Sequence, residues 1–417
     1  MGDGRQQGKV LYPIEQLLWT GILMHATKLG ARRQIKFQFD TPQCHQTLKR
    51  WLGFDDIPHG DTLNNCFMQA ELACLEPIPG KMVGELIRSK AIDQFRLMGY
   101  YILIATDGTG VLSFDTQHCP DCLHVTQHGK TTWYHPVLEA KLVTRNGLAL
   151  SVATEFIENT DPSDSKQDCE LKAFYRLAPK IKAAFPRLPV CLLLDGLYAA
   201  APVFKICQDF DWKFIITLKD KDLKSVNEEF LALREQMPEN QKRHRRGEHN
   251  EIQQLSTWVS DIEYKTRETK NAPSFFLNVL ECTDTYPDSS HKRFRWVTNI
   301  ELNRGTAHRV GNQGGRLRWK IENEGFNEQK NGGFELEHAF STNTTSAKCF
   351  YILLQLACTL LQLMFKTNLM SEQCRRTLGG VRRLSARLLE AFRCHSLRTD
   401  EIHNALHHRK RVSFIFR

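Results

Sequence analysis

The chain has 417 residues, of which 41% are hydrophobic and 25% are charged, values typical of a soluble globular protein. This length allows one large core with one or two smaller modules. The net charge is +9, and residues 371–417 carry +7 of it, with 11 Lys and Arg against 4 Asp and Glu. A basic C-terminal segment on a nearly neutral body indicates contact with a polyanion or, equally well, an exposed tail that charge keeps soluble.

Cysteine usage and hydropathy argue against a secreted or membrane-spanning protein. The 13 cysteines are odd in number, and several, such as Cys191 and Cys358, lie within apolar runs, as reduced core thiols do. We therefore expect a cytoplasmic or nucleoid setting, and no signal peptide is apparent. The most apolar run, residues 349–365, is interrupted by Gln355 and Gln362, so it predicts a buried helix and no membrane contact.

Residues 1–95 predict a helical N-terminal region. Ile14, Leu17, Leu18 and Ile22 recur at helical spacing, and a turn near Asp61 supplies an N-cap for a later helix. A small helical module of this kind is a candidate for DNA binding, although such modules more often only pack.

Strand patterns begin at residue 100. The expected order is a strand at 100–105 that ends in a glycine turn at 107–110, strands at 137–143 and 148–156, a helix at 166–184, a strand at 190–194, a helix at 203–210 and a strand at 213–217. Asn146-Gly147 predicts the hairpin between the second and third strands. Asp107 and Asp195 each follow a buried strand, where open α/β sheets bind ligands; a turn residue or an N-cap is the alternative for each.

A second group of strands follows at residues 226–300. A charged helix near 223–233 precedes three strand-like segments at 252–259, 274–281 and 293–298. The basic run 242–246 is expected in a polar loop, where Arg243, Arg245 and Arg246 contact phosphates or are simply solvated.

Residues 316–330 predict a helix rich in charge. Arg318, Glu322 and Lys330 can lie on roughly one side of it, although most helices of this composition are solvated faces stabilised by i,i+4 pairs. Glu324 is the rival acid: it points about 200° away from Glu322 around a helix, so both cannot face one metal site. The spacing from Arg318 favours Glu322.

Three acids on separate elements suit divalent-metal chemistry on phosphodiesters. Asp107, Asp195 and Glu322 offer hard oxygen ligands of the kind that Mg²⁺ or Mn²⁺ prefers. The order of three strands, helix, strand, helix, strand and later helix is that of the ribonuclease H fold. We therefore predict an α/β protein with a ribonuclease H-like mixed sheet, divided into residues 96–225 and 301–370, with a β-rich insertion at 226–300 and a basic helical tail at 371–417.

The same residues carry a family resemblance. The matching motifs are Thr106-Asp107-Gly-Thr, Lys166-Gln-Asp-Cys-Glu170, Asp195-Gly-Leu-Tyr-Ala199, Trp296-Val-Thr-Asn299 and Arg318-Trp-Lys-Ile-Glu322-Asn-Glu-Gly-Phe-Asn. Together they resemble the DDE-type insertion-sequence transposases, in the branch whose ribonuclease H domain is interrupted before the last acid.

The resemblance implies a cut-and-paste DNA transposase. Asp107, Asp195 and Glu322 would hold two Mg²⁺ or Mn²⁺ ions, and Arg318 and Lys330 would contact transposon-end phosphates. It also implies terminal inverted repeats, a target DNA, a homodimer in the synaptic complex, and stacking of a flipped base on Trp258 or Trp296. Two departures from the signature are Gly315, where a tyrosine is expected, and Lys330, which lies one residue farther from Glu322 than usual.

Two other functions fit the same sequence. One is a ribonuclease H-fold nuclease that cuts without joining, and the other is a domesticated DNA-binding protein without catalysis. The complete set of three acids argues against the second.

Cys119-Pro-Asp-Cys122 is a separate motif. With His124 nearby it could begin a zinc site, but no second CxxC or HxxxH follows at standard spacing, and His128 and His135 are the remaining partners. The sequence therefore favours core or loop cysteines without metal.

Overall fold

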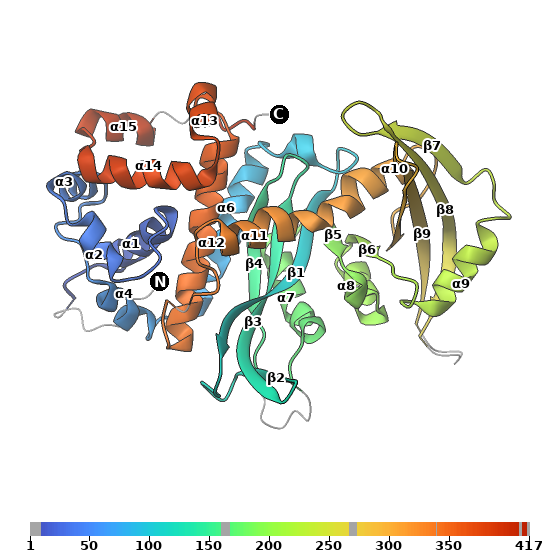
Figure 1. Ribbon diagram of the computed structural model, residues 1–417, viewed down its shortest axis with the longest axis horizontal. Coiled ribbons are helices and arrows are strands. Elements are labelled where there is room, and N and C mark those ends of the chain that lie inside the picture. The colour runs from blue at the N-terminus through green and yellow to red at the C-terminus, as the bar shows by residue number, and fades with distance from the viewer. Residues whose placement is uncertain (1–9, 160–166, 267–272, 339, 408–410, 415–417) are drawn as a thin grey trace.

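The computed structural model describes residues 10–159, 167–266, 273–338, 340–407 and 411–414. It is a mixed α/β structure in which one open, mixed sheet is flanked by helices (Figure 1). The strands are β1 (Ile102–Phe114), β2 (Leu123–Gln127), β3 (Lys130–Val143), β4 (Ala149–Phe156), β5 (Val190–Leu194), β6 (Lys213–Thr217), β7 (Gln241–Arg246), β8 (Ile252–Lys265), β9 (Ser274–Thr285) and β10 (His291–Thr298). The helices are α1 (Ile14–Ala26), α2 (Gln34–Phe39), α3 (Pro42–Leu52), α4 (Gly60–Phe67), α5 (Leu72–Leu75), α6 (Pro77–Arg88), α7 (Glu170–Ala184), α8 (Ala201–Asp209), α9 (Lys224–Leu233), α10 (Ala307–Arg309), α11 (Asn327–Asn331), α12 (Thr344–Lys366), α13 (Glu372–Leu378), α14 (Val381–Cys394) and α15 (Thr399–His407).

The sheet has the order β2-β3-β1-β5-β6-β10-β9-β8-β7, with β4 paired to β3 beside β2. β1, β5 and β6 run parallel, and all other neighbours are antiparallel. The five strands predicted between residues 100 and 217 are present, and Gly147 makes the predicted β3–β4 turn at φ 80°. The strands of residues 241–298 continue the same sheet through the pairing of β10 with β6.

The predicted glycine turn at residues 107–110 is wrong. β1 runs through Asp107, Gly108 and Gly110 to Phe114, and the pairing with β3 shifts register only between Gly110 and Leu112. Glycine within a strand marks a bulge or a close approach as often as a turn. Here a Cβ on Gly108 would lie 2.3 Å from a carboxylate oxygen of Glu170, so the glycine makes room for that side chain.

The predicted loop at the basic run 242–246 is also wrong. These residues form β7, an edge strand that pairs with β8 alone. Arg243 and Arg245 are exposed and alternate with less exposed neighbours, as strand geometry requires. Positive charge on an edge strand discourages pairing with another sheet.

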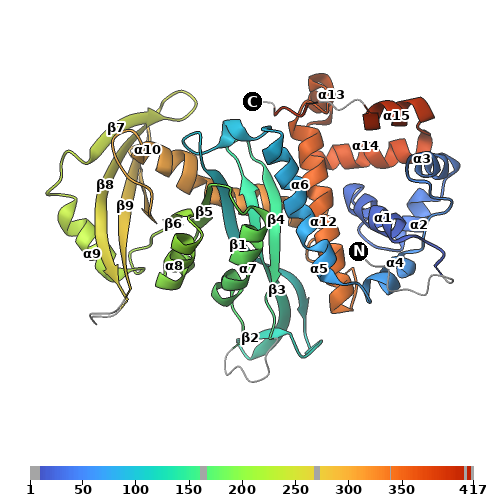
Figure 2. The same ribbon diagram turned by 180° about the vertical axis from the view of Figure 1, so that it is seen from behind.

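Helices cover both faces of the sheet. α7 and α8 lie on one face, seen from the front in Figure 2. A continuous but irregular helix, residues 307–331, crosses the opposite face from β9 to β4. It begins as α10 and ends as α11. Between them lie a π-helical turn at Val310–Gly314, a tighter 3₁₀ turn at Gly315–Trp319 and a second π-helical turn at Ile321–Phe326. Such interruptions often mark functional positions in helices.

α12 is the buried helix that the sequence predicts at residues 349–365. It packs on α1 and α4 on one side and on β4 on the other (Figure 1). α12 is long and apolar enough to cross a membrane, but 72% of its most apolar stretch is buried inside the protein. α14, in the basic segment 371–417, packs on α2, α3 and α12, so this segment adds to the N-terminal helical layer.

Candidate active site

Sheet register brings Asp107 and Asp195 together. β1 and β5 are parallel neighbours with Ala105 opposite Leu193, and each aspartate lies two residues beyond this pair. The register therefore places the two aspartates at the same level of neighbouring strands, and the charges of both, after burial and Glu170, raise the pKa of the Tyr198 hydroxyl. Asp195 also serves as the predicted N-cap: its Oδ1 accepts a hydrogen bond of 2.8 Å from the backbone N–H of Leu197.

Glu322, on the irregular helix, is linked to Asp107 by Arg318, which contacts both carboxylates. The Nη1 atom of Arg318 lies 3.2 Å from Asp107 Oδ2 and 3.2 Å from Glu322 Oε1. The guanidinium is largely buried, with 11% of the side chain exposed. An arginine thus lies between two of the acids and neutralises part of their charge.

The structure separates Glu322 from its rival Glu324. The Glu324 carboxylate pairs with Lys320 at 2.6 Å and lies against Gly147 in the β3–β4 turn. It therefore points away from Asp107, as helical geometry predicts for residues two positions apart.

Burial and like charge make Asp107 a strong proton acceptor. The pKa of Asp107 is raised to about 7, mainly by burial and then by a hydrogen bond to Glu322 and by the negative charges of Glu322 and Glu170, while Arg318 acts in the opposite direction. Carboxylates crowded in this manner favour a bound proton or a bound cation.

Asp107→Asn should make stability less dependent on pH. A carboxyl whose pKa is higher in the folded than in the unfolded protein contributes stability below the unfolded value of about 3.9, and this contribution is lost as the pH rises through about 7. The melting temperature of Asp107→Asn relative to the wild type should therefore increase between pH 5 and pH 8, measured calorimetrically with a chelator present. A difference that stays constant over this range would contradict the raised pKa.

Glu170 is a fourth carboxylate at the site. It begins α7, packs against Gly108 beside Asp107, and accepts a hydrogen bond from the Tyr198 hydroxyl at 3.4 Å. Burial, followed by the charge of Asp195, raises the pKa of Glu170. The sequence suggested a supporting role for residues 166–170: Glu170 has such a place, whereas Asp168 pairs with Arg176 at 2.6 Å and Lys166 lies outside the described residues.

The basic residues named from the sequence lie farther from the acids. Lys330 pairs with Glu337 at 2.6 Å, and Arg246 pairs with the buried Asp284. Arg243 and Arg245 are the two members of the basic run whose side chains face solvent. Of the predicted DNA contacts, only Arg318 touches the carboxylates.

Gly315, where the transposase signature has tyrosine, is explained by packing. A Cβ at this position would lie 2.5 Å from the indole ring of Trp296, so no larger residue fits without a shift of the helix or the ring. Trp296 and Trp258 are each only 3% exposed, and Trp296 also contributes to the lining of an open cleft. The expected stacking of a base on one of these rings stays a prediction.

An open cleft of about 620 Å³ is lined by the end of β6 and the residues after it, by β10 and by the irregular helix. Its lining is basic and aromatic: it includes Lys219, Tyr286, Lys292, Arg293, Phe294, Arg316 and Trp319. Trp319 is 53% exposed and adjoins Arg318, whose guanidinium carbon is 5.8 Å from the indole ring. The sequence favours a core position for Trp319, as for most tryptophans in helices, and the exposure of the ring shows that this expectation is wrong.

The acids do not form a compact ligand cage. Among the described residues, only Cys119, Cys122 and His135 form a group of three His, Cys, Asp or Glu side chains whose ligand atoms all lie within 4.8 Å of one another. Asp107, Asp195 and Glu322 are more widely spaced, with Arg318 between two of them.

No model of a known protein family matches the sequence, and no curated protein matches it significantly.

Proposed function

We propose that the protein is a DNA transposase that cleaves the ends of a mobile element and transfers the freed 3′-hydroxyl into target DNA. The observation that carries this proposal is the meeting of Asp107, next to Asp195 on parallel strands, with Arg318 and Glu322 from one helix. One acid on the first strand, one after the next parallel strand and one on a later helix are the arrangement that the transposase resemblance implies.

The sheet order supports a ribonuclease H-like core. β4-β3-β1-β5-β6 has three antiparallel strands followed by two parallel additions, with α7 and α8 as the connections. In this interpretation β7–β10 and α9 are an insertion between the core and the helix that carries Glu322.

The donor set fits divalent metal ions. Asp107, Asp195 and Glu322 would hold Mg²⁺ or Mn²⁺, because all three offer oxygen ligands. The pKa of Asp107 is raised first by burial and then by neighbouring carboxylates, whose negative charge a cation would offset. Bound ions of this kind activate water and stabilise charge on the attacking and leaving oxygens. Arg318 holds Asp107 and Glu322 in place and supplies a fixed positive charge for a DNA phosphate. Glu170 and Tyr198 keep the neighbouring wall of the site rigid.

The partners follow from this reaction: double-stranded DNA with terminal inverted repeats, a target DNA, and a second copy of the protein to pair the two ends. Arg243 and Arg245 on the edge strand β7, the basic cleft and the segment 371–417 are candidate phosphate contacts.

The decisive experiment is a strand-transfer assay. The inverted repeats that flank the gene would supply the DNA, and pre-cleaved ends would be incubated with protein, Mg²⁺ and a supercoiled target. We expect joined products. Cleavage of intact ends without joining would favour a nuclease, and binding without either reaction would favour a DNA-binding protein without catalysis.

Trp319→Ala should weaken binding to DNA ends that carry an unpaired base. Stacking of a base on an exposed aromatic ring contributes about 1–3 kcal/mol, so the dissociation constant should rise about 5-fold to 150-fold. Fluorescence anisotropy with a labelled end would measure it. Phe276→Ala removes a side chain that is also exposed, at 64%, but lies outside the cleft, and should bind normally. Equal losses in both variants would show that Trp319 has no specific contact with DNA.

A further inference from the structure

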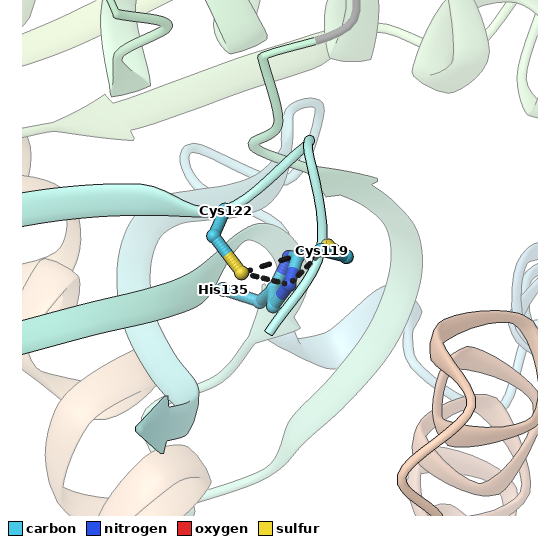
Figure 3. Close-up of side chains that lie close together, drawn as sticks. All are labelled: Cys119, Cys122 and His135. Atoms are coloured by element: carbon cyan, nitrogen blue, oxygen red, sulfur yellow. Dashed lines mark hydrogen bonds between the residues drawn. The ribbon is translucent and has the colours of Figure 1, made fainter. Parts of the chain in front are cut away.

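The motif Cys119-Pro-Asp-Cys122 has a third partner that is distant in sequence. The Cys119 and Cys122 sulfurs lie 3.5 Å apart, and the Nε2 atom of His135 lies 3.3 Å from the first and 3.1 Å from the second (Figure 3). The strand register explains the meeting: Cys122 immediately precedes β2, which pairs with β3, and His135 belongs to β3.

These distances are those of ligands around one metal ion. For tetrahedral Zn²⁺, bond lengths of about 2.3 Å to sulfur and about 2.05 Å to nitrogen place ligand atoms about 3.6–3.8 Å apart. The observed separations are shorter by at most about 0.5 Å, so a small outward movement accommodates the ion. Two thiolates and an imidazole are a soft donor set that selects zinc and disfavours Mg²⁺.

The surroundings of His135 support metal binding. Its other ring nitrogen, Nδ1, faces Glu158 Oε1 at 3.4 Å, an ion-pair contact without good hydrogen-bond geometry. A carboxylate at this position favours the tautomer with its proton on Nδ1, which leaves Nε2 free to bind a metal. Glu158 is itself held by Lys348 at 2.5 Å, and both His135 and Glu158 are buried.

The cysteine turn is held in place by backbone contacts. The Cys122 N–H donates to the carbonyl oxygen of Cys119 at 3.4 Å, and Asn159 donates to the carbonyl oxygens of Asp121 and Cys122 at 3.1 Å each. The other nearby histidines point elsewhere: the His124 ring packs on Trp133, and His128 lies in the exposed β2–β3 turn.

We propose that Cys119, Cys122 and His135 bind one zinc ion, with Glu158 orienting the histidine and water in the fourth position. The ion would fasten the loop after β1 to β3 and so fix the base of the β2–β3 hairpin, which projects from the sheet in Figure 1. This site is separate from the proposed active site and binds metal whether or not the protein acts on DNA.

Metal content of the purified full-length protein tests the proposal directly. We expect about one zinc ion per chain by plasma mass spectrometry, and thiolate-to-metal charge-transfer absorption when Co²⁺ is added to the metal-free protein. Wild-type protein that holds no zinc and shows no such absorption would overturn the site, as would recovery of a Cys119–Cys122 disulfide in protein that does not bind metal.

Variants identify the ligands. Cys119→Ser, Cys122→Ser and His135→Ala should lose zinc and the charge-transfer band, and Glu158→Gln should bind zinc about 10–100-fold more weakly. Cys169→Ser, at an exposed cysteine, and His124→Ala are the matched controls and should keep both signals. Zinc content that is unchanged in Cys122→Ser would refute the assignment, and the wild-type measurements remain decisive if a variant fails to fold.

Discussion

Replacing Asp195 with alanine should lower Mg²⁺-dependent cleavage of transposon-end DNA about 10³-fold or more. A site that lacks one metal ligand stabilises the charge that develops in the transition state less well, by several kcal/mol. About 4 kcal/mol corresponds to a 10³-fold change in rate. Asp107→Ala and Glu322→Ala should have the same effect, because each supplies one side of the same site. Binding of the ends should change only a few-fold, since Arg318 and the basic cleft remain.

Glu324→Ala is the matched control. Glu324 is two residues from Glu322 on the same helix, but its carboxylate pairs with Lys320 and faces the β3–β4 turn. This variant should cleave DNA nearly as well as the wild type. Full activity in Glu322→Ala, or complete loss in Glu324→Ala, would show that the third acid is misassigned.

Glu139→Ala should destabilise the fold by about 3–5 kcal/mol, the range measured when one partner of a buried ion pair is removed. Glu139 and Lys141 are fully buried, with their charged atoms 3.5 Å apart. The Glu139 carboxylate also accepts hydrogen bonds from Thr154 at 2.7 Å and Tyr351 at 2.9 Å. Alanine would leave an ammonium group and these hydroxyls without their charged partner. Urea denaturation followed by circular dichroism would measure the loss.

Two further variants separate charge from packing. Adding Lys141→Met to Glu139→Ala should recover part of the lost stability, because the unpaired ammonium is then removed. Asp209→Ala breaks the half-exposed pair with Lys205 on α8 and should cost at most about 1 kcal/mol. A loss in Glu139→Ala no larger than that in Asp209→Ala would mean that the buried pair contributes little.

Local sequence patterns predicted much of the fold. Apolar runs and the Asn146-Gly147 turn identified β3 to β6, and helical spacing identified α7, α8 and α12. Apolar runs, turn dipeptides and helical spacing depend on residues that are close together in the chain, so they can be read from the sequence. They also placed Asp195 directly after β5, whereas Asp107, expected after a strand, lies within β1; β1 and β5 are parallel neighbours.

The features that escaped prediction depend on distant partners. β1 continues through its glycines because β3 pairs with it from Ile104 to Phe114. β7 forms because it pairs with the edge of β8. Lys141 is buried because Glu139, Gln355 and the helix α12 enclose it, and no local pattern reports such a partner. The same holds for His135, whose role beside Cys119 and Cys122 follows from strand register.

α12 contributes side chains to two hydrophobic cores of the protein. Its Phe350 and Leu353 belong to the core of the N-terminal helices, whereas its Leu354 and Leu361 belong to the core beneath the irregular helix. A protein trimmed to residues 96–370 would expose the first of these surfaces to water, a continuous apolar strip on a helix that is otherwise well covered. The N-terminal helices therefore cover an apolar surface of the part of the chain that carries the acids.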